Sequence, residues 1–291
     1  MESFLSLILN TILLRPYVFA FLFVYLLGCS LHLGVKRAIS FCAAGYLIAW
    51  LSEYSSIHNG IPYGYYYYIE QTKGKELWVL GVPLMDSLSY VFLAYASYSM
   101  AILMISPLLR RGGMFYILET KKIRNSLFTT TLGAILFVYL DIIIDPVALL
   151  GDRWFLGQIY GYPARGIYFG VPISNFLGWL VVGFLLIYTV QKIDSLLHST
   201  PDWFGYKYGW RYLIGPGLYC GVIIFNLSIT FYIREYTLAW VGIFIILLPS
   251  TLLYYLIKIK PYPQEFNDAL KAHLSDFPHV IIPGFAQRKV S

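Results

Sequence analysis

The sequence is poor in charge. Asp, Glu, Lys and Arg together make up 12% of its 291 residues, whereas a soluble domain contains about 25%. Hydrophobic residues account for 58% of the chain, and the mean hydropathy is +0.65. This balance excludes an ordinary soluble domain and predicts an all-α integral membrane protein. The net charge of +6 then concerns membrane topology, and we expect no nucleic-acid partner.

Several motifs of metal and nucleotide enzymes are missing. The five histidines form no H-x-x-H or H-x-x-x-H pair, which argues against di-iron desaturases and zincins. The chain has neither a Walker A motif nor a G-x-G-x-x-G loop. Its three cysteines, Cys29, Cys42 and Cys220, lie in apolar stretches, and we expect them to be small core residues without disulfides. The sequence therefore predicts no metal site.

Seven apolar stretches are long enough to cross a bilayer, which takes about 20 helical residues each. The first lacks the basic start and the A-x-A site of a signal peptide, so we expect it to remain as a span. A seven-helix transmembrane domain is predicted over residues 1–260, followed by a cytoplasmic interfacial tail over 261–291 with a short surface helix from Phe266 to Leu274. The spans lie near residues 12–33, 38–57, 83–106, 126–146, 172–191, 211–232 and 237–257.

The distribution of basic residues predicts the orientation. With seven spans, one side of the membrane holds 15 Lys and Arg residues and the other holds 6. Lys and Arg are retained on the cytoplasmic side of short loops. We therefore expect the N-terminus outside and the C-terminus inside, in a multi-pass protein of the cytoplasmic membrane.

Five polar residues are predicted to share one membrane depth. Asp141 and Asp145 end the fourth span and lie four residues apart, on one helix face. Glu53, Asp86 and Asn175 fall near the outer ends of the second, third and fifth spans. A carboxylate at membrane depth is expensive to bury, so it is a functional-site hypothesis by default. No comparable cluster is expected at the inner ends.

The sequence also contains an internal echo. Gly81 to Tyr90 matches Gly170 to Trp179 in its Gly-Val-Pro start and in a polar residue three positions after the proline. Proline suits a helix start because its missing N–H has no partner there. Glu53 lies 33 residues before Asp86, and Asp141 lies 34 before Asn175. Spans two and three and spans four and five are thus predicted to be parallel copies of one helix hairpin.

Each of these residues also has a purely structural interpretation. Glu53 could cap a helix at the interface, and Asp86 could sit in a first turn favoured by the helix dipole. The Gly-, Pro- and Tyr-rich outer loops, near residues 59–68 and 154–169, could form an interfacial aromatic belt. Alternatively, these two loops fold over the acids as an aromatic lid.

Four segments together resemble one known family, the membrane proteins of carotenoid biosynthesis, over about residues 40 to 260. Its members include bisanhydrobacterioruberin hydratase and a γ-carotene 1′-hydroxylating hydratase. The segments are Glu53-Tyr54 with Gly60-Ile61-Pro62-Tyr63-Gly64-Tyr65-Tyr66, Gly81-Val82-Pro83-Leu84, Asp141-x-x-x-Asp145-Pro146-Val147-Ala148, and Tyr168-x-Gly170-Val171-Pro172-x-Ser174-Asn175-Phe176-x-Gly178-Trp179.

The resemblance implies a cofactor-free hydratase. Such an enzyme adds water across the terminal C1=C2 double bond of an acyclic (ψ) carotenoid end group and yields a tertiary alcohol. Its partners are then the carotenoid, water and membrane lipid, together with other enzymes of the carotenoid pathway.

The chemistry of hydration suggests roles for the predicted cluster. An acid must protonate C2, the cation at C1 must be tolerated, and water must lose a proton after it attacks C1. We expect Asp141 to be the general acid, Asp145 or Glu53 to handle the water, and Asp86 to position it or tune its neighbours. Aromatic faces can stabilise the cation. The side chains expected to contact the substrate are Asn175, Tyr54, Tyr63, Tyr65, Tyr66, Tyr168 and Trp179.

The same acids leave other functions open. A lycopene-cyclase-type enzyme uses the same protonation but lets an internal alkene capture the cation. An intramembrane prenyltransferase would hold Mg²⁺ between Asp141 and Asp145, but its second Asp-rich motif is reduced to Asp86. A transporter would place its acids near the bilayer midplane. A retinal-type receptor needs a lysine within its last span, whereas Lys258 lies at the end of it.

Overall fold

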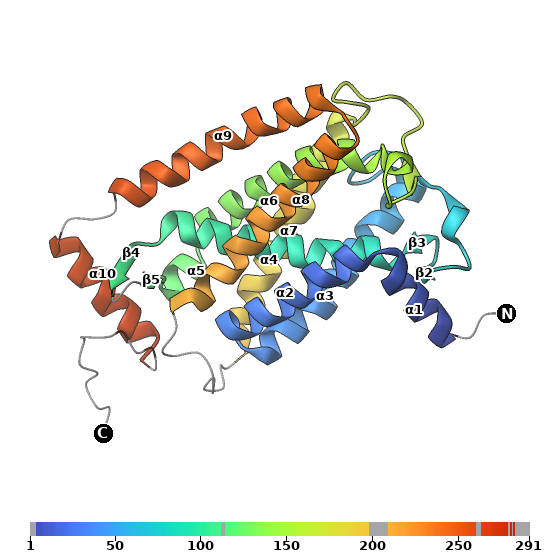
Figure 1. The fold of residues 1–291 in the computed structure, drawn as a ribbon. Helices are drawn as coiled ribbons and strands as arrows, with labels where there is room; N and C mark the ends of the chain where they lie inside the picture. The colour runs from blue at the N-terminus through green and yellow to red at the C-terminus, as the bar shows by residue number, and fades with distance from the viewer. Residues whose placement is uncertain are drawn as a thin grey trace.

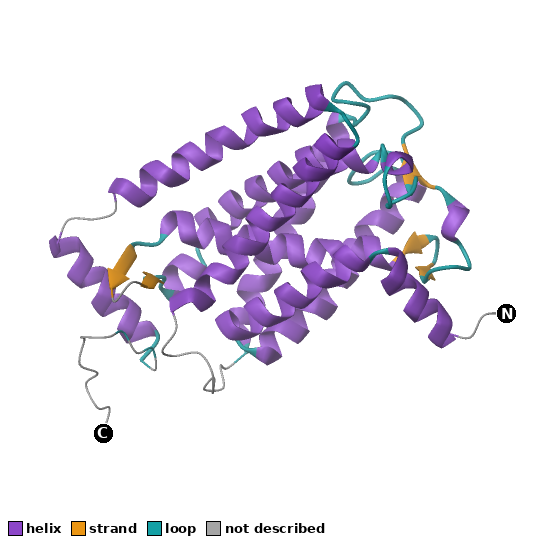
Figure 2. Cartoon of the chain, viewed as in Figure 1, coloured by secondary structure: helices purple, strands orange, loops and turns teal. Residues whose placement is uncertain are grey.

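The computed structural model describes residues 4–111, 114–197, 209–259, 263–278, 280 and 282. This part of the chain is mostly helical, with short strands only in the loops (Figures 1 and 2). The α-helices are α1 (Phe4–Leu14), α2 (Pro16–Leu33), α3 (Val35–Asn59), α4 (Leu84–Ile105), α5 (Lys121–Arg124), α6 (Leu127–Ala148), α7 (Ile173–Leu196), α8 (Ile214–Tyr232), α9 (Tyr236–Ile259) and α10 (Pro263–Asp276). The strands are β1 (Tyr67–Tyr68), β2 (Trp78–Val79), β3 (Val82–Pro83), β4 (Leu108–Arg111), β5 (Met114–Ile117) and β6 (Tyr160–Gly161).

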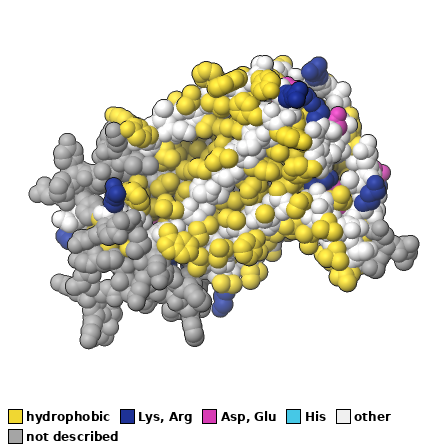
Figure 3. All heavy atoms as spheres, viewed as in Figure 1, with side chains coloured by type: hydrophobic (Ala, Val, Ile, Leu, Met, Phe, Trp, Pro, Cys, Tyr) yellow, Lys and Arg dark blue, Asp and Glu magenta, His cyan; other side chains and the backbone are white. Residues whose placement is uncertain are grey.

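Six helical segments within the described residues are long and apolar enough to cross a membrane. They are α2, α4, α6, α7, α8 with the turn before it, and α9. Apolar side chains accordingly cover much of the face shown in Figure 3. Helix α3 has 25 residues, enough to span, but charged residues near both ends make it less apolar. The fold is therefore consistent with a multi-pass membrane protein, and the seventh span and the orientation stay predictions.

Two element boundaries differ from those expected. The stretch predicted as one span from residue 12 is divided at Arg15, where α1 ends and α2 begins at Pro16. Proline fits a first helical turn but not a helix interior, so it favours a new helix there. Helix α6 instead continues past Pro146 to Ala148. Asp145 therefore lies inside a helix and not at its end.

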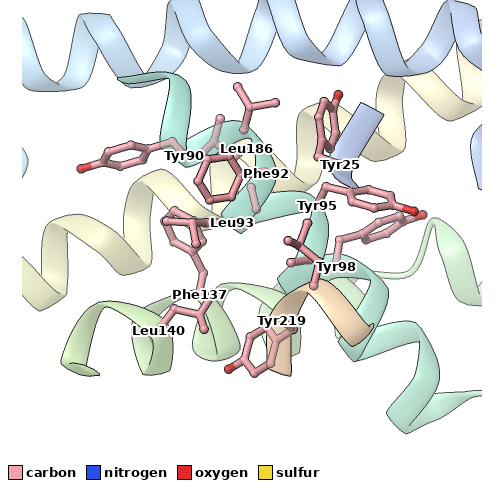
Figure 4. Packing of buried hydrophobic residues seen from close by; sticks show 14 of the residues in the cluster. Tyr25, Tyr90, Phe92, Leu93, Tyr95, Tyr98, Phe137, Leu140, Leu186 and Tyr219 are labelled. Carbon is pink, nitrogen blue, oxygen red and sulfur yellow. The ribbon is translucent and has the colours of Figure 1, made fainter. Parts of the chain in front are cut away.

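Helix α4 is the centre of the bundle. It is the most buried of the apolar segments, and α2, α3, α6, α7 and α8 all pack against it. Figure 4 shows its aromatic side chains Tyr95 and Tyr98, and Leu93, facing the core. Helices α6 and α7 approach closely because each carries a glycine at the contact. A Cβ atom on Gly133 would lie 2.6 Å from Ile187 Cδ1, and one on Gly183 would lie 2.7 Å from Phe137 Cδ1.

The two predicted hairpins share a local geometry. Leu80 and Gly81 have φ angles of 48° and 86°, and Phe169 and Gly170 have 48° and 93°. In each copy this left-handed pair precedes Val-Pro and the start of a helix. The packing is also equivalent, because α3 contacts α4 and α7 while α6 contacts α7 and α4. The first helix of each hairpin thus packs against the second helix of both hairpins, as expected when two parallel helix hairpins are related by a two-fold axis.

The opposite end of the bundle holds a buried ionic cluster, contrary to the expectation that the inner ends carry none. Glu119, fully buried between β5 and α5, lies 2.5 Å from Arg124 and 3.0 Å from His32 of α2. Arg124 also lies 3.5 Å from Asp194 of α7, which pairs with Arg37 at 3.2 Å. Burial alone would raise the pKa of Glu119, but Arg124 and His32 lower it well below its usual range.

The C-terminal helix packs against this cluster. Helix α10 spans Pro263–Asp276, longer than the surface helix expected over residues 266–274. His273 Nδ1 lies 2.6 Å from the Glu119 carbonyl oxygen, and the Arg124 guanidinium lies 4.4 Å from the centre of the Phe277 ring. Leu270 joins an apolar cluster with Leu109 and Tyr116 of the β4–β5 hairpin. The described part of the tail is thus packed against the bundle end.

Replacing Glu119 by Gln should lower the free energy of unfolding by about 3–5 kcal/mol, because Arg124 loses its nearest counter-ion while it stays buried. Equilibrium unfolding in mixed detergent micelles measures this change. The matched control is Glu70→Gln, which breaks an exposed pair with Lys73 and should cost less than about 1 kcal/mol. Equal effects of the two substitutions would contradict a structural role for the buried pair.

Candidate active site

A cavity of about 120 Å³ lies at the end of the bundle that carries the β1–β6 loops. Its wall is formed by α2, α3, α4, α6, α7 and α8 together with both aromatic loops. A buried water needs on the order of 10–15 Å³ measured in this way. The cavity therefore has room for several waters or for a small apolar end group.

The first hairpin contributes one pair of acids to this cavity. Glu53 of α3 is 1% exposed and accepts a hydrogen bond from the Ser87 hydroxyl of α4. Asp86 precedes Ser87 in the first turn of α4, where the helix dipole favours a negative charge. Its Oδ2 atom accepts a bond of 2.7 Å from the Tyr68 hydroxyl. Both acids thus receive hydrogen bonds from neutral side chains.

The second hairpin contributes a more tightly held pair. Asn175 Nδ2, at the start of α7, donates to Asp141 Oδ2 at 2.8 Å and to Asp145 Oδ2 at 2.9 Å. Asp145 accepts two further bonds, from Tyr160 at 2.6 Å and from Tyr162 at 2.8 Å. Asp141 is fully buried, and its Oδ1 atom has no hydrogen-bond partner. One amide group therefore bridges the two carboxyl groups of α6.

The two aromatic loops pair with each other above the acids. Strands β1 and β6 are antiparallel, and Tyr68 lies opposite Tyr160 in their register. Burial raises the pKa of both hydroxyl groups, and the neighbouring carboxyl groups raise it further. The tyrosines therefore stay protonated and donate. The loop also passes close to α7, because a Cβ atom on Gly64 would lie 2.5 Å from Ser174 Oγ.

Stacked aromatic rings form the deep wall of the cavity. The rings of Tyr90 on α4 and Trp179 on α7 are stacked, with centroids 4.7 Å apart. Phe137 of α6 lies beneath Trp179 at 4.6 Å. Tyr66 of the first loop approaches Tyr160 of the second at 6.1 Å. Aromatic side chains therefore make up much of the cavity wall beside the acids.

None of these four acids has a basic partner in the part of the chain that the structure describes. The ion pairs formed there by Lys, Arg and His involve other acids, such as Glu76 with Arg15 at 3.4 Å. The described residues also contain no group of three or more His, Cys, Asp and Glu side chains arranged to hold a metal ion. The site is therefore rich in negative and neutral groups only.

Most of the predicted site residues gather here. Asp141 is displaced from the cavity wall and contacts it through Asn175. Tyr54, Tyr65 and Tyr168 do not line the cavity. The residues that do are Glu53, Asp86, Asp145, Asn175, Tyr63, Tyr66 and Trp179.

The three tyrosines outside the cavity have other surroundings. Tyr54 stacks on Trp50 at 5.4 Å, and Tyr65 is 60% exposed. Tyr168 packs against Phe176 with its hydroxyl group buried and unpartnered. Their expected contact with substrate gains no support from these positions.

Three hydrogen-bond donors of the site lie in the predicted aromatic loops but were not among the predicted site residues. Tyr68, Tyr160 and Tyr162 hold the acids directly, yet they stand among many other loop tyrosines. Only the β1–β6 pairing selects them, and two-residue strands leave little signal in a sequence. Ser87 was detectable in principle, since it lies 34 residues after Glu53, as Asn175 does after Asp141.

Comparison with known proteins identifies the family. No curated protein and no solved structure matches the chain. The family model for carotenoid biosynthesis proteins matches residues 5–249, a range that contains every acid and tyrosine of the cavity. The chain therefore belongs to the carotenoid biosynthesis protein family.

Proposed function

We propose that the protein is a carotenoid hydratase that adds water across the C1=C2 double bond of an acyclic end group. The observation that supports this most is the cavity in which buried acids receive only neutral donors. A tertiary carbocation is the high-energy species of the reaction, and negative groups with fixed dipoles stabilise such a charge where it develops. Membership of the carotenoid biosynthesis family supplies the substrate class.

The proton donor in this proposal is Glu53. It lines the cavity, is almost fully enclosed, and accepts one hydrogen bond, from Ser87. A carboxyl group enclosed by apolar walls keeps its proton more readily than one in water. Its proton forms the new C–H bond at C2, using the π electrons of the alkene, and leaves C1 as a tertiary cation. The proton that Asp145 takes from water returns to Glu53 before the next turnover, and Asp86, which lines the same cavity as both, serves as the intermediate carrier of that proton.

Asp145 completes the reaction. Its three hydrogen bonds hold it as an acceptor, the state that stabilises the cation and takes a proton from the attacking water. Water forms the C1–O bond and releases that proton, so the net change is one water molecule added. Ser89 and Asn226 also line the cavity and can hold the water beside C1, which favours hydration over cyclisation.

Asp141 becomes a positioning residue in this scheme. It is fully buried behind Asn175 and shares the amide hydrogen-bond donor with Asp145. Two negative charges this close repel each other, and a buried carboxyl pair is favoured when it holds one proton. Asp141 thereby fixes the orientation of Asn175 and the charge of its neighbour, while the substrate meets Asp145.

Expression of the full chain in a lycopene-producing host should yield pigments heavier by one water molecule for each end group modified, as mass spectrometry measures. Asp145→Asn should lower this conversion by about 10²- to 10⁴-fold, the usual range for loss of an acid or base. The control is Asp152→Asn, an exposed acid of the outer loop, which should convert like the wild type. A product of unchanged mass with a new ring would indicate a cyclase instead.

Glu53→Gln should abolish turnover to a similar extent, about 10²-fold or more, because Gln keeps the hydrogen bond from Ser87 but has no proton to give. Glu53→Asp should retain part of the activity, with a shifted pH–rate profile. Membrane assays with an acyclic carotenoid measure both. Wild-type turnover by Glu53→Gln would remove this residue from the role of donor.

A further inference from the structure

A second cavity lies further along the bundle and has a different chemistry. It has a volume of about 230 Å³ and lies between α4, α6, α8 and α9. Met100, Leu136, Ile223 and Leu253 are among its lining residues, and none of the described residues that line it is charged. The Tyr219 hydroxyl group donates to the Leu136 carbonyl oxygen at 2.8 Å, so this tyrosine presents its ring to the space. We call this space the apolar groove.

The apolar groove and the candidate active site are lined by residues of the same three helices, α4, α6 and α8. On α8, Val222 and Asn226 line the site while Tyr219 and Ile223 line the groove. Asn226 and Tyr219 are seven residues apart, about 10 Å along a helix. On α6, Asp145 lines the site and Tyr139 lines the groove. An extended chain attached to an end group at the acids reaches the groove within a few isoprene units.

Helix α9 forms the most exposed wall of the groove. It is the least buried of the apolar segments and is held to the bundle at its start, where Leu238 packs with Val147 and Ile233. A Cβ atom on Gly242 would lie 3.0 Å from Leu227 of α8, which marks a close approach there. Beyond this point α9 diverges from α8 (Figure 1).

The divergent part of α9 contains an interior proline. Pro249 leaves one carbonyl group of the helix without its backbone partner and favours a kink. Pro249 and the neighbouring Ser250 both line the groove. The large exposed side chains of α9, such as Phe244 and Leu248, are apolar, so this wall of the groove is apolar on its outer side as well.

We propose that the apolar groove binds the polyene chain of the carotenoid while its end group occupies the acid cavity. This rests on the proposed function for the identity of the end group. The groove offers contacts with thioether, aliphatic and aromatic side chains. A conjugated hydrocarbon fits such a surface because it has no group that forms hydrogen bonds. The helix walls common to both cavities set one direction for the substrate, with the reacting end at the acids and the chain toward α9.

The test uses the full-length protein in lipid nanodiscs and an achiral acyclic carotenoid. Such a pigment has no circular dichroism in the visible range when free and gains it in a chiral binding site. Ser250→Trp fills the groove and should weaken binding about tenfold or more, since overfilling a packed site is unfavourable. The matched control is Leu248→Trp, two residues away and 66% exposed, which does not line the groove and should bind like the wild type.

Two further variants separate this proposal from the hydratase assignment. Asp145→Asn should keep the induced dichroism while it loses turnover, because it leaves the groove intact. Ser250→Leu fills less space than Trp and should weaken binding by a smaller factor, which guards against a folding defect in the larger variant. Equal binding by Ser250→Trp and Leu248→Trp would overturn the groove proposal and assign this space to lipid. If the wild-type protein binds the pigment normally but forms no hydrated product, the groove proposal stands and the hydratase assignment is wrong.

Discussion

The structure depends on keeping several carboxyl groups inside an apolar bundle without a basic partner. An isolated buried charge costs several kcal/mol unless hydrogen bonds compensate it. Asn175 meets this requirement for two acids at once, with bonds of 2.8 and 2.9 Å to Asp141 and Asp145. Tyrosine hydroxyl groups of the aromatic loops donate further hydrogen bonds to the buried acids. The conformation of the loops and the placement of the acids therefore depend on each other, because loop tyrosines supply the donors that the buried acids require.

The buried acids have different partners at the two ends of the bundle. At the end that carries α10, Glu119 and Asp194 are matched by Arg124 and other basic groups, so that cluster is balanced and holds the loops and α10 in place. At the acid cavity the carboxyl groups receive hydrogen bonds from neutral donors, and no basic residue forms an ion pair with them among the described residues. A site of this kind is complementary to a positive charge that appears only during the reaction. The contrast between the ends supports catalysis at one and stabilisation at the other.

Much of the helical fold and two of the buried acids could be predicted from sequence, because a bilayer restricts both the length and the polarity of a spanning helix. Length and hydropathy located the helices, and the expense of burying a charge singled out Asp141 and Asp145. The echo of Gly-Val-Pro anticipated the paired turns at Gly81 and Gly170. The donors could not be predicted, since Tyr68 and Tyr160 are selected by a two-residue strand pairing between distant loops. The ionic cluster around Glu119 could not be predicted, because its members lie in loops and near helix ends, where charged residues are common.

The near-symmetry of the hairpins makes the differences between their acids informative. In the first copy a serine holds Glu53, and in the second an amide holds Asp141 from the same sequence separation of 34 residues. A serine gives one donor and leaves the carboxyl group able to carry a proton into the cavity. The amide gives two bonds and draws Asp141 and Asp145 together. A duplicated hairpin that supplied identical acids would have two donors or two acceptors, whereas hydration needs one of each. The two hairpins thus hold their acids with different donors, Ser87 in one and Asn175 in the other, which is the asymmetry that the proposed acid–base mechanism requires.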